Sequence, residues 1–289
     1  MSDRSVPPNL SAFMNHLKCP DCNNGVARSR ADITCNGCGR NFEITEDGIL
    51  CMLPSRRKPL PAEYDDPDYK RMSAMFDDAQ DYFTDGNSFF NAIHVSAHKT
   101  IQGWMRENPP AGGSWICDLG CGNGFHMRYF EGDPARLVGV DIRLESLAKC
   151  RSRSSDVILV QADLACLPFH NSVFQTMLSV YALEHVYYLA EASDEVLRVV
   201  TEGGALYVGL PCEGGLAWNL GRKLTSERTM SKRYNLDYRK YIQLEHCNDA
   251  ADIVKVLRER VRHQRRAHFP FRLLPFISTN LTVTAAYTK

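Results

Sequence analysis

Four cysteines near the N-terminus have the spacing of a metal site. Cys19 and Cys22 form one C-x-x-C pair, and Cys35 and Cys38 form a second pair after twelve intervening residues. Two such pairs supply the four thiolates of a tetrahedral zinc site. A segment of about 45 residues buries little apolar surface, so we expect the metal to contribute to its folding. The spacing predicts a structural zinc ribbon, with redox or buried thiols as the alternative.

A glycine-rich turn follows a short apolar run in the segment SWICDLGCGNGF. Gly120 and Gly122 allow the backbone to approach a ligand closely, and Asp118 stands directly before them. The G-x-G-x-G spacing differs from the G-x-G-x-x-G of dinucleotide sites, so we expect no pyrophosphate there. An acid beside such a turn favours a cationic ligand that carries an amino acid.

Two further acids belong to the apolar runs LVGVDI and VILVQADL. Asp141 is 23 residues after Asp118, and Asp163 belongs to the next run. An acid at the position of Asp141 accepts hydrogen bonds from both hydroxyls of a ribose. We expect Asp163 to face an adenine amine, with a capping or surface carboxylate as the alternative for each acid.

Two histidines are candidates for proton transfer. His185 ends the run SVYALEHV, at the sheet edge where acceptors bind in such folds, and His246 lies in LEHCN. Histidine is the commonest general base in enzymes. We predict that both act on the reacting group, with a pocket-shaping role as the alternative.

Buried parallel strands must position these residues. Short apolar runs alternate with helical patterns, which predicts an α/β fold with a doubly wound sheet. A helix is expected from about Leu189 to Val200, and RAHFPF and NLTVTAAYTK are expected to be the closing pair of strands. We expect the apolar stretch FPFRLLPF between them to pack as core or loop, with contact to a membrane or a partner as the alternative.

Five motifs in order carry a family resemblance over roughly residues 90–211. DLGCGNG, GVDI, QADLACLPF, SVYALEHV and LRVVTEGGALYVGLP resemble the successive motifs of class I S-adenosylmethionine-dependent methyltransferases of the UbiE-like type. The resemblance implies a Rossmann-like sheet of seven strands whose final strand is antiparallel, and S-adenosylmethionine as cofactor. It also implies these cofactor contacts: Asp118, Gly120, Gly122, Asp141, Ile142, Asp163, Leu164 and Val180.

The N-terminal segment carries a second resemblance. Roughly residues 15–54 resemble the small zinc-ribbon partner subunit of tRNA and release-factor methyltransferases. This implies a structural zinc ion and a protein partner for the ribbon.

Three regions follow from these motifs. We expect a zinc ribbon over 1–54, a linker and lid-like helical segment over 55–90, and a methyltransferase domain over 91–289 with an acceptor-binding insertion at about 212–248. Apolar residues at helical spacing predict packing helices in the second region. The alternative is a lid that carries one of three tyrosines toward the acceptor, namely Tyr64, Tyr69 or Tyr82.

The charge distribution bears on the acceptor. The net charge is zero, but residues 216–289 hold 15 Lys and Arg against 6 Asp and Glu. Arginines interleaved with aromatic residues in the insertion favour an anionic small molecule or a glycan precursor, with a solvated charged surface as the alternative. The insertion and EHCN loosely resemble methyltransferases of bacterial surface-polysaccharide synthesis. A ribosomal-RNA guanine methyltransferase is the first alternative, although a neutral chain suits a polyanion poorly; a non-catalytic cofactor-binding partner is the second.

The composition excludes other classes of protein. Hydrophobic residues make up 44% and charged residues 24%, as in globular proteins, and no run approaches the roughly 18 apolar residues of a membrane span. The first residues lack an apolar signal core, and the cysteine count is odd at eleven. We therefore expect a cytoplasmic protein without a disulfide framework.

Overall fold

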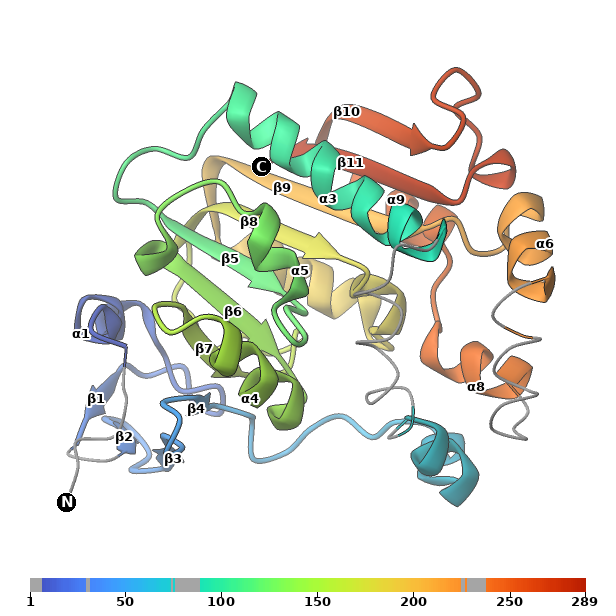
Figure 1. Cartoon of the computed structure of the whole chain (residues 1–289). Helices are drawn as coiled ribbons and strands as arrows, with labels where there is room; N and C mark the ends of the chain where they lie inside the picture. Colours follow the sequence, from blue (N-terminus) through green and yellow to red (C-terminus); the bar gives the residue numbers. More distant parts are fainter. Residues whose placement is uncertain (1–6, 30–31, 74, 76–88, 225–226, 228–237) are drawn as a thin grey trace.

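An eight-stranded sheet organises the molecule. The computed structural model describes residues 7–29, 32–73, 75, 89–224, 227 and 238–289 (Figure 1). The strand order is β10-β11-β9-β8-β5-β6-β7-β4. Its members are β4 (Leu50–Cys51), β5 (Trp115–Leu119), β6 (Leu137–Asp141), β7 (Ile158–Gln161), β8 (Phe174–Val180), β9 (Val200–Pro211), β10 (Arg262–Phe269) and β11 (Thr282–Thr288).

The direction of the strands confirms the predicted fold. Strands β5 to β9 pair in parallel, and β11 pairs antiparallel with both β9 and β10. Every residue of β5 and β6 is buried, as expected for parallel strands covered on both faces. The seven-stranded, doubly wound sheet is therefore present, and β4 adds an eighth strand that the sequence did not predict.

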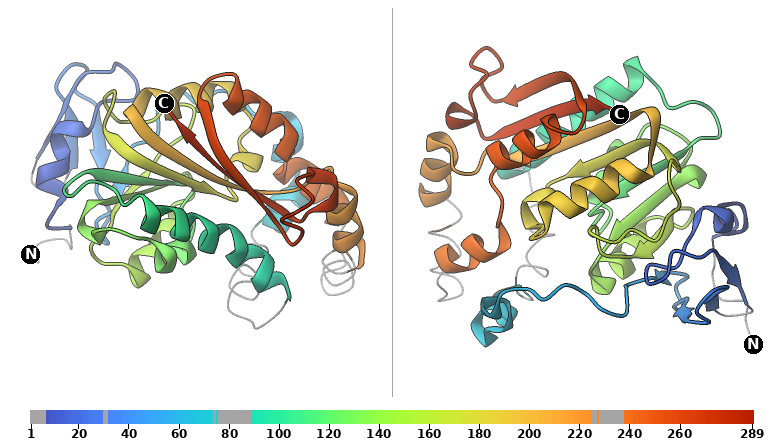
Figure 2. Two further views of the ribbon diagram at one scale, coloured as in Figure 1. Left: turned by 90° about the horizontal axis from the view of Figure 1, so that it is seen from above. Right: turned by 180° about the vertical axis from the view of Figure 1, so that it is seen from behind.

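Helices cover both faces of the sheet. Helices α3 (Phe89–Glu107) and α4 (Leu144–Arg153) lie on one face, and α5 (Leu189–Val199) and α9 (Ala250–Arg258) lie on the other (Figure 2). Ile116 of β5 packs in a cluster with Leu147 of α4, whereas the next residue, Cys117, packs in a cluster with Val196 of α5. This alternation is the two-residue period of a strand.

The N-terminal ribbon packs directly on this sheet. It contains α1 (Leu10–Phe13) and a three-stranded antiparallel sheet of β1 (Val26–Arg28), β2 (Asp32–Cys35) and β3 (Asn41–Glu43). The Phe13 ring lies 4.7 Å from the Trp115 ring, and Leu50 of β4 pairs with Val160 of β7. Among the described residues, the buried side chains of the ribbon join the core of the sheet. Apolar burial therefore stabilises this segment in addition to any metal.

Two short helices follow β9. Helix α6 (Leu216–Leu224) comes first and α8 (Tyr238–Glu245) precedes α9. The predicted basic run of the insertion is described only in part, because residues 225–226 and 228–237 lie outside the described residues. In the described part of the chain, no helix has both the length and the apolar character needed to cross a bilayer.

Candidate active site

The glycine turn after β5 brings bare backbone to the edge of the sheet. Gly120 and Gly122 have φ angles of +71° and +51°, which favour glycine. A Cβ on Gly120 would lie 2.3 Å from the Cβ of Ala182. The Gly120 amide donates to the Val140 carbonyl at 2.7 Å, which fixes the turn against β6.

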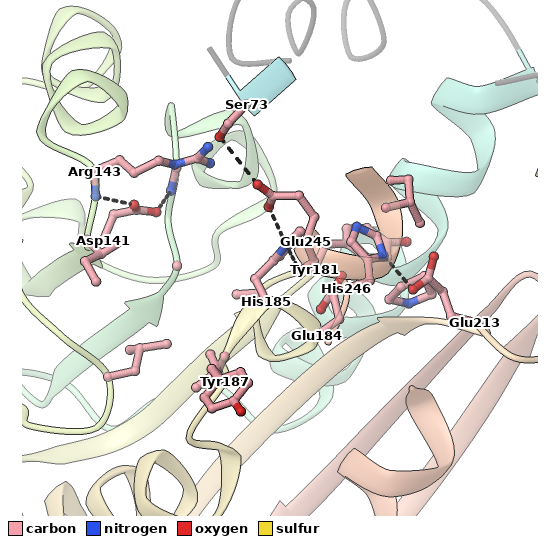
Figure 3. Close-up of a pocket in the computed structure, with 18 of the residues that line it drawn as sticks. Ser73, Asp141, Arg143, Tyr181, Glu184, His185, Tyr187, Glu213, Glu245 and His246 are labelled. Atoms are coloured by element: carbon pink, nitrogen blue, oxygen red, sulfur yellow. Dashed lines mark hydrogen bonds and ion pairs between the residues drawn. The ribbon is translucent and has the colours of Figure 1, made fainter. Parts of the chain in front are cut away.

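Asp141, at the end of β6, ties this turn to the next loop. Its Oδ2 accepts a hydrogen bond from the Gly122 amide and its Oδ1 accepts one from the Arg143 amide, both at 2.9 Å (Figure 3). A carboxylate oxygen has two lone pairs, so each oxygen retains one for a ligand hydroxyl.

Asp118 is an unusual buried acid. Its Oδ1 has no hydrogen-bond partner, and burial, with the nearby charge of Asp141, raises its pKa to about 7. Asp118 and Val180 line a small cavity of about 20 Å³, and His98 lines both this cavity and the large one described next. Unpaired buried carboxylates are costly, so this position fits a cationic group of a ligand.

A cavity of about 560 Å³ runs from the glycine turn to the two predicted histidines. The sequence-predicted site residues on its wall are Gly120, Gly122, Asp141, Ile142, Asp163, Leu164, His185 and His246. The structure thus brings eight predicted residues into one cavity and places Asp118 and Val180 beside it.

The segment after the ribbon crosses the Asp163 end of this cavity. Asp163 accepts a hydrogen bond from the Ala165 amide at 3.0 Å, and Arg57 forms an ion pair with it at 3.2 Å. Lys58 forms an ion pair with Glu191 at 2.7 Å. Arg57 could not be predicted as a site residue from sequence, because it is separated from Asp163 by 106 positions.

At the other end, His185 is paired with Glu245 from α8. The Nδ1 of His185 lies 2.8 Å from the Glu245 carbonyl oxygen and 3.2 Å from its Oε2, while Tyr69 donates to Oε1 at 2.7 Å. Burial alone would lower the pKa of His185, but Glu245 and the charge of Glu184 raise it to about 9. Burial alone would raise the pKa of Glu245, but His185 and Tyr69 hold it at about 2. The pair is therefore charged at neutral pH.

The second histidine has its own glutamate. His246 Nδ1 lies 2.6 Å from Glu213 Oε2, and Trp218 Nε1 donates to Glu213 Oε1 at 3.0 Å. The His185 and His246 rings meet edge to face, with centroids 4.6 Å apart (Figure 3). Sequence analysis missed Glu213; the signal was its position directly after the fifth apolar run, at the edge where His185 ends the fourth.

Glu184 has one carboxyl oxygen without a hydrogen-bond partner. It is 2% exposed, lines the cavity, and its Oε2 makes no hydrogen bond. Burial raises its pKa, although His185 and His246 act in the opposite direction. A buried carboxyl group with a raised pKa is a better proton acceptor than an exposed one.

Two of the three candidate lid tyrosines reach the cavity. Tyr64 and Tyr69 both line it, and the Tyr64 hydroxyl donates to the Leu244 carbonyl of α8 at 2.7 Å. Tyr82 lies outside the described residues.

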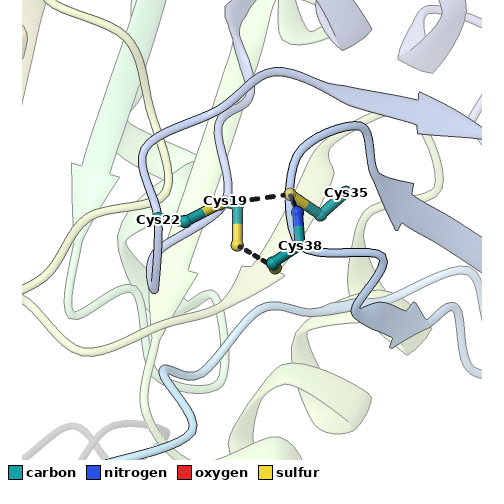
Figure 4. A group of neighbouring side chains, drawn as sticks. All are labelled: Cys19, Cys22, Cys35 and Cys38. Carbon is teal, nitrogen blue, oxygen red and sulfur yellow. Dashed lines mark hydrogen bonds between the residues drawn. The ribbon is translucent and has the colours of Figure 1, made fainter.

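The four cysteines of the ribbon converge (Figure 4). All four sulfur atoms lie within 4.8 Å of one another, with Cys19 and Cys38 at 3.8 Å and Cys22 and Cys35 at 3.3 Å. Thiolates around a tetrahedral ion with bonds of about 2.3 Å are separated by about 3.8 Å. The Gly37 and Cys38 amides also point at the Cys35 sulfur, at 3.3 and 3.4 Å. The donor set therefore fits a tetrahedral metal ion.

Comparison with known proteins agrees with this geometry. A family profile described as a methyltransferase domain matches residues 117–208, from β5 through β9. Residues 117–208 therefore match a methyltransferase domain. The crystal structure of N-methyltransferase NodS from Bradyrhizobium japonicum WM9, in complex with S-adenosyl-L-homocysteine, shares the fold. The TM-score is 0.54 at 13% identity, over 78% of this chain and 99% of that chain.

Relatives of the methyltransferase domain differ in their acceptors. A putative 23S rRNA (guanine-N(1)-)-methyltransferase of Bacillus subtilis strain 168 is 24% identical over 57% of this chain and 56% of the relative. A malonyl acyl-carrier-protein O-methyltransferase of Salmonella typhimurium is 30% identical over 35% of this chain and 40% of the relative. The chain spans about half the length of the known relatives it matches.

Proposed function

We propose that the chain transfers a methyl group from S-adenosylmethionine to a small-molecule acceptor that shares its cavity. The observation that carries this proposal is the single cavity of about 560 Å³ that joins the glycine turn and Asp141 to the His185–Glu245 and His246–Glu213 pairs. Methyl transfer requires the donor and the nucleophile to be aligned and water to be kept out. A cavity that holds both molecules would meet these two requirements.

The residues present fit the sulfonium nucleoside, which supplies an activated methyl group. Asp118 would hold the ammonium group of its amino acid, and the bare backbone at Gly120 and Gly122 would leave room for the amino-acid portion beside the turn. Asp141 would accept the ribose hydroxyls. The apolar side chains Ile142 and Leu164 would cover the adenine, and Asp163 would accept from its amine once Arg57 moves aside.

We propose Glu184 as the group that accepts a proton from the acceptor. Its free Oε2 and raised pKa support this role. His185 is protonated while it pairs with Glu245, so it would position the acceptor by donating a hydrogen bond. His246, beside Glu213, would act as a second contact.

An anionic portion of the acceptor has a place in the same cavity. Arg222 of α6 lines it, and the Nε of Arg222 is buried without a hydrogen-bond partner. A guanidinium group in this state binds carboxylate or phosphate. This supports an anionic small molecule, glycan precursors included, whose nucleophilic end lies near Glu184.

In the ribbon we propose a structural Zn²⁺ ion on the four cysteines. The sulfur separations and the amide-to-sulfur contacts support it. Its role would be to hold the ribbon against the edge of the sheet, since no acid or histidine among the residues that the structure describes joins the cluster.

Transfer of a labelled methyl group into a fractionated cell extract tests the proposed activity. We expect label in the small-molecule or glycan fraction with the natural chain and none with Asp141→Lys. Asp47→Lys makes the same charge change on the exposed surface of the ribbon and should leave transfer intact. Binding of S-adenosylhomocysteine with no label in any fraction would indicate a non-catalytic partner and contradict the proposal.

A ribosomal-RNA guanine methyltransferase is the second candidate. The relative from Bacillus subtilis favours it. The overall charge argues against it, because a chain with a net charge of zero suits a polyanion poorly. Label confined to the RNA fraction would decide for this candidate.

A further inference from the structure

The molecule displays a group of exposed apolar side chains beside the mouth of the cavity. On α6 these are Leu216, 78% exposed, and Leu220, 61% exposed. On the loop after β10 they are Phe271, Leu273, Leu274 and Phe276, of which Leu273 is 95% exposed. The other large exposed apolar residues among those described, Leu60, Ile142 and Tyr187, line the cavity. We call the six residues of α6 and the loop the apolar rim. The stretch FPFRLLPF was expected to pack as core or loop; it forms a loop after β10, and its apolar side chains at 271–276 are exposed and do not pack in the core.

The two parts of the apolar rim are contiguous. Gly215, before α6, packs so closely on the loop that a Cβ there would lie 2.7 Å from the Ile277 carbonyl oxygen. A Cβ on Gly221 would contact Leu281 at 3.9 Å. Figures 1 and 2 show α6 beside the loop that joins β10 to β11.

The loop holds its apolar side chains outward by internal hydrogen bonds. The fully buried Asn280 accepts from the Phe271 amide at 2.8 Å and donates to the carbonyls of Leu274 at 2.6 Å and Phe276 at 3.0 Å. Because these bonds fix the loop backbone, its apolar side chains stay exposed to water, which is unfavourable for the free protein. Contiguous exposed apolar residues on a structured loop mark an interaction site.

The surroundings of the apolar rim are basic. Arg272 and Lys223 are exposed within it, and neither residues 214–226 nor residues 260–289 contain an acid. Apolar side chains that project beside basic ones are the pattern of proteins that insert into the surface of an anionic bilayer. The charge within the apolar rim therefore favours an anionic surface as its partner.

We propose that the apolar rim docks the protein on the surface of an anionic lipid bilayer. Helix α6 presents Leu216 and Leu220 to solvent and Trp218 and Arg222 to the cavity. Docking would therefore place the mouth of the cavity at the headgroup layer, where an amphipathic anionic acceptor is accessible. This last step rests on the proposed function; the docking itself does not.

Co-sedimentation of the full chain with lipid vesicles tests the docking without any enzymatic readout. We expect binding to vesicles of phosphatidylcholine and phosphatidylglycerol in equal parts, weakened by high salt, and little binding to phosphatidylcholine alone. Leu273→Asp with Phe276→Asp should lower the partition coefficient at least about tenfold. Leu273→Asn should lower it less. Ser29→Asp, on the exposed ribbon, should leave it unchanged.

Two outcomes would overturn the proposal. One is sedimentation with anionic vesicles that does not exceed the pure phosphatidylcholine control. The other is a self-associated natural chain that Leu273→Asp converts to a monomer without changing vesicle binding, because the apolar rim would then bind a second copy. Neither outcome bears on methyl transfer, which the labelled-methyl assay measures separately. Failure of the docking and failure of the proposed function are therefore distinguishable.

Discussion

Replacement of Asp118 by asparagine should stabilise the unliganded protein at high pH. Burial raises the pKa of this carboxyl to about 7, against about 3.9 in an unfolded chain. The folded state therefore holds the proton more tightly, and the protein loses stability as the pH rises from about 4 to about 7. Three pH units correspond to at most about 4 kcal/mol. Asparagine has the same shape and does not ionise, so the variant escapes this loss.

Urea unfolding at about pH 4 and about pH 8 measures the effect. The difference in unfolding free energy between Asp118→Asn and the natural chain should rise by about 2–4 kcal/mol from the lower to the higher pH. Asp47→Asn, an exposed acid, should show no such rise. A difference in unfolding free energy that does not change with pH would refute the conclusion that Asp118 is a buried carboxyl group with a raised pKa.

The same carboxyl group should govern ligand binding. A cationic group beside Asp118 favours its ionised form, so affinity for S-adenosylhomocysteine should fall about tenfold for each pH unit below about 7. Calorimetric titration across this range should show this pH dependence of the affinity in the natural chain. The Asp118→Asn variant should bind more weakly, with an affinity that hardly changes with pH. Equal affinity of the two proteins for S-adenosylhomocysteine at about pH 8 would show that Asp118 does not contact the ligand.

Three further predictions address the turn, the histidine pair and the metal. Gly120→Ala should abolish binding of S-adenosylhomocysteine in titration calorimetry, because its Cβ would collide at 2.3 Å; Gly113→Ala, also at positive φ but in open space, should retain binding. Glu245→Gln should lower the pKa of His185 from about 9 toward about 6.5, which NMR titration of the imidazole would detect; an unchanged pKa would contradict the pairing. Purified protein should contain one zinc per chain by elemental analysis, and chelation should lower the melting temperature; a metal-free chain of equal stability would contradict the structural role.

The strands and the acids at their carboxyl ends were predictable because their signals are local. Apolar runs that end at or near Asp118 and Asp141 specify buried strands with an acid close to the carboxyl end. Because the strands are parallel, both acids lie at the same edge of the sheet. The contact of β4 with the sheet was not predictable: a two-residue strand carries no periodicity, and its pairing with Val160 depends on packing of the whole ribbon.

The end of the cavity that holds His185 and His246 was predictable only in part. His185 and His246 could be identified by residue type, but His185 meets Glu245 across 60 positions of sequence, through a helix whose placement no local pattern fixes. The exposure of the loop at 271–276 was not predictable for a related reason. Its apolar composition is compatible with core packing, with a loop or with contact to a membrane or a partner, and it is the buried Asn280 side chain that holds the loop backbone so that the apolar groups face outward.

A crystal structure of the chain with S-adenosylhomocysteine tests the central claim most directly. The account predicts the nucleoside in the large cavity, with the ribose hydroxyls on Asp141, the amino group toward Asp118 and the adenine between Ile142 and Leu164. A ligand bound elsewhere, or a cavity left empty at saturating concentration, would contradict it.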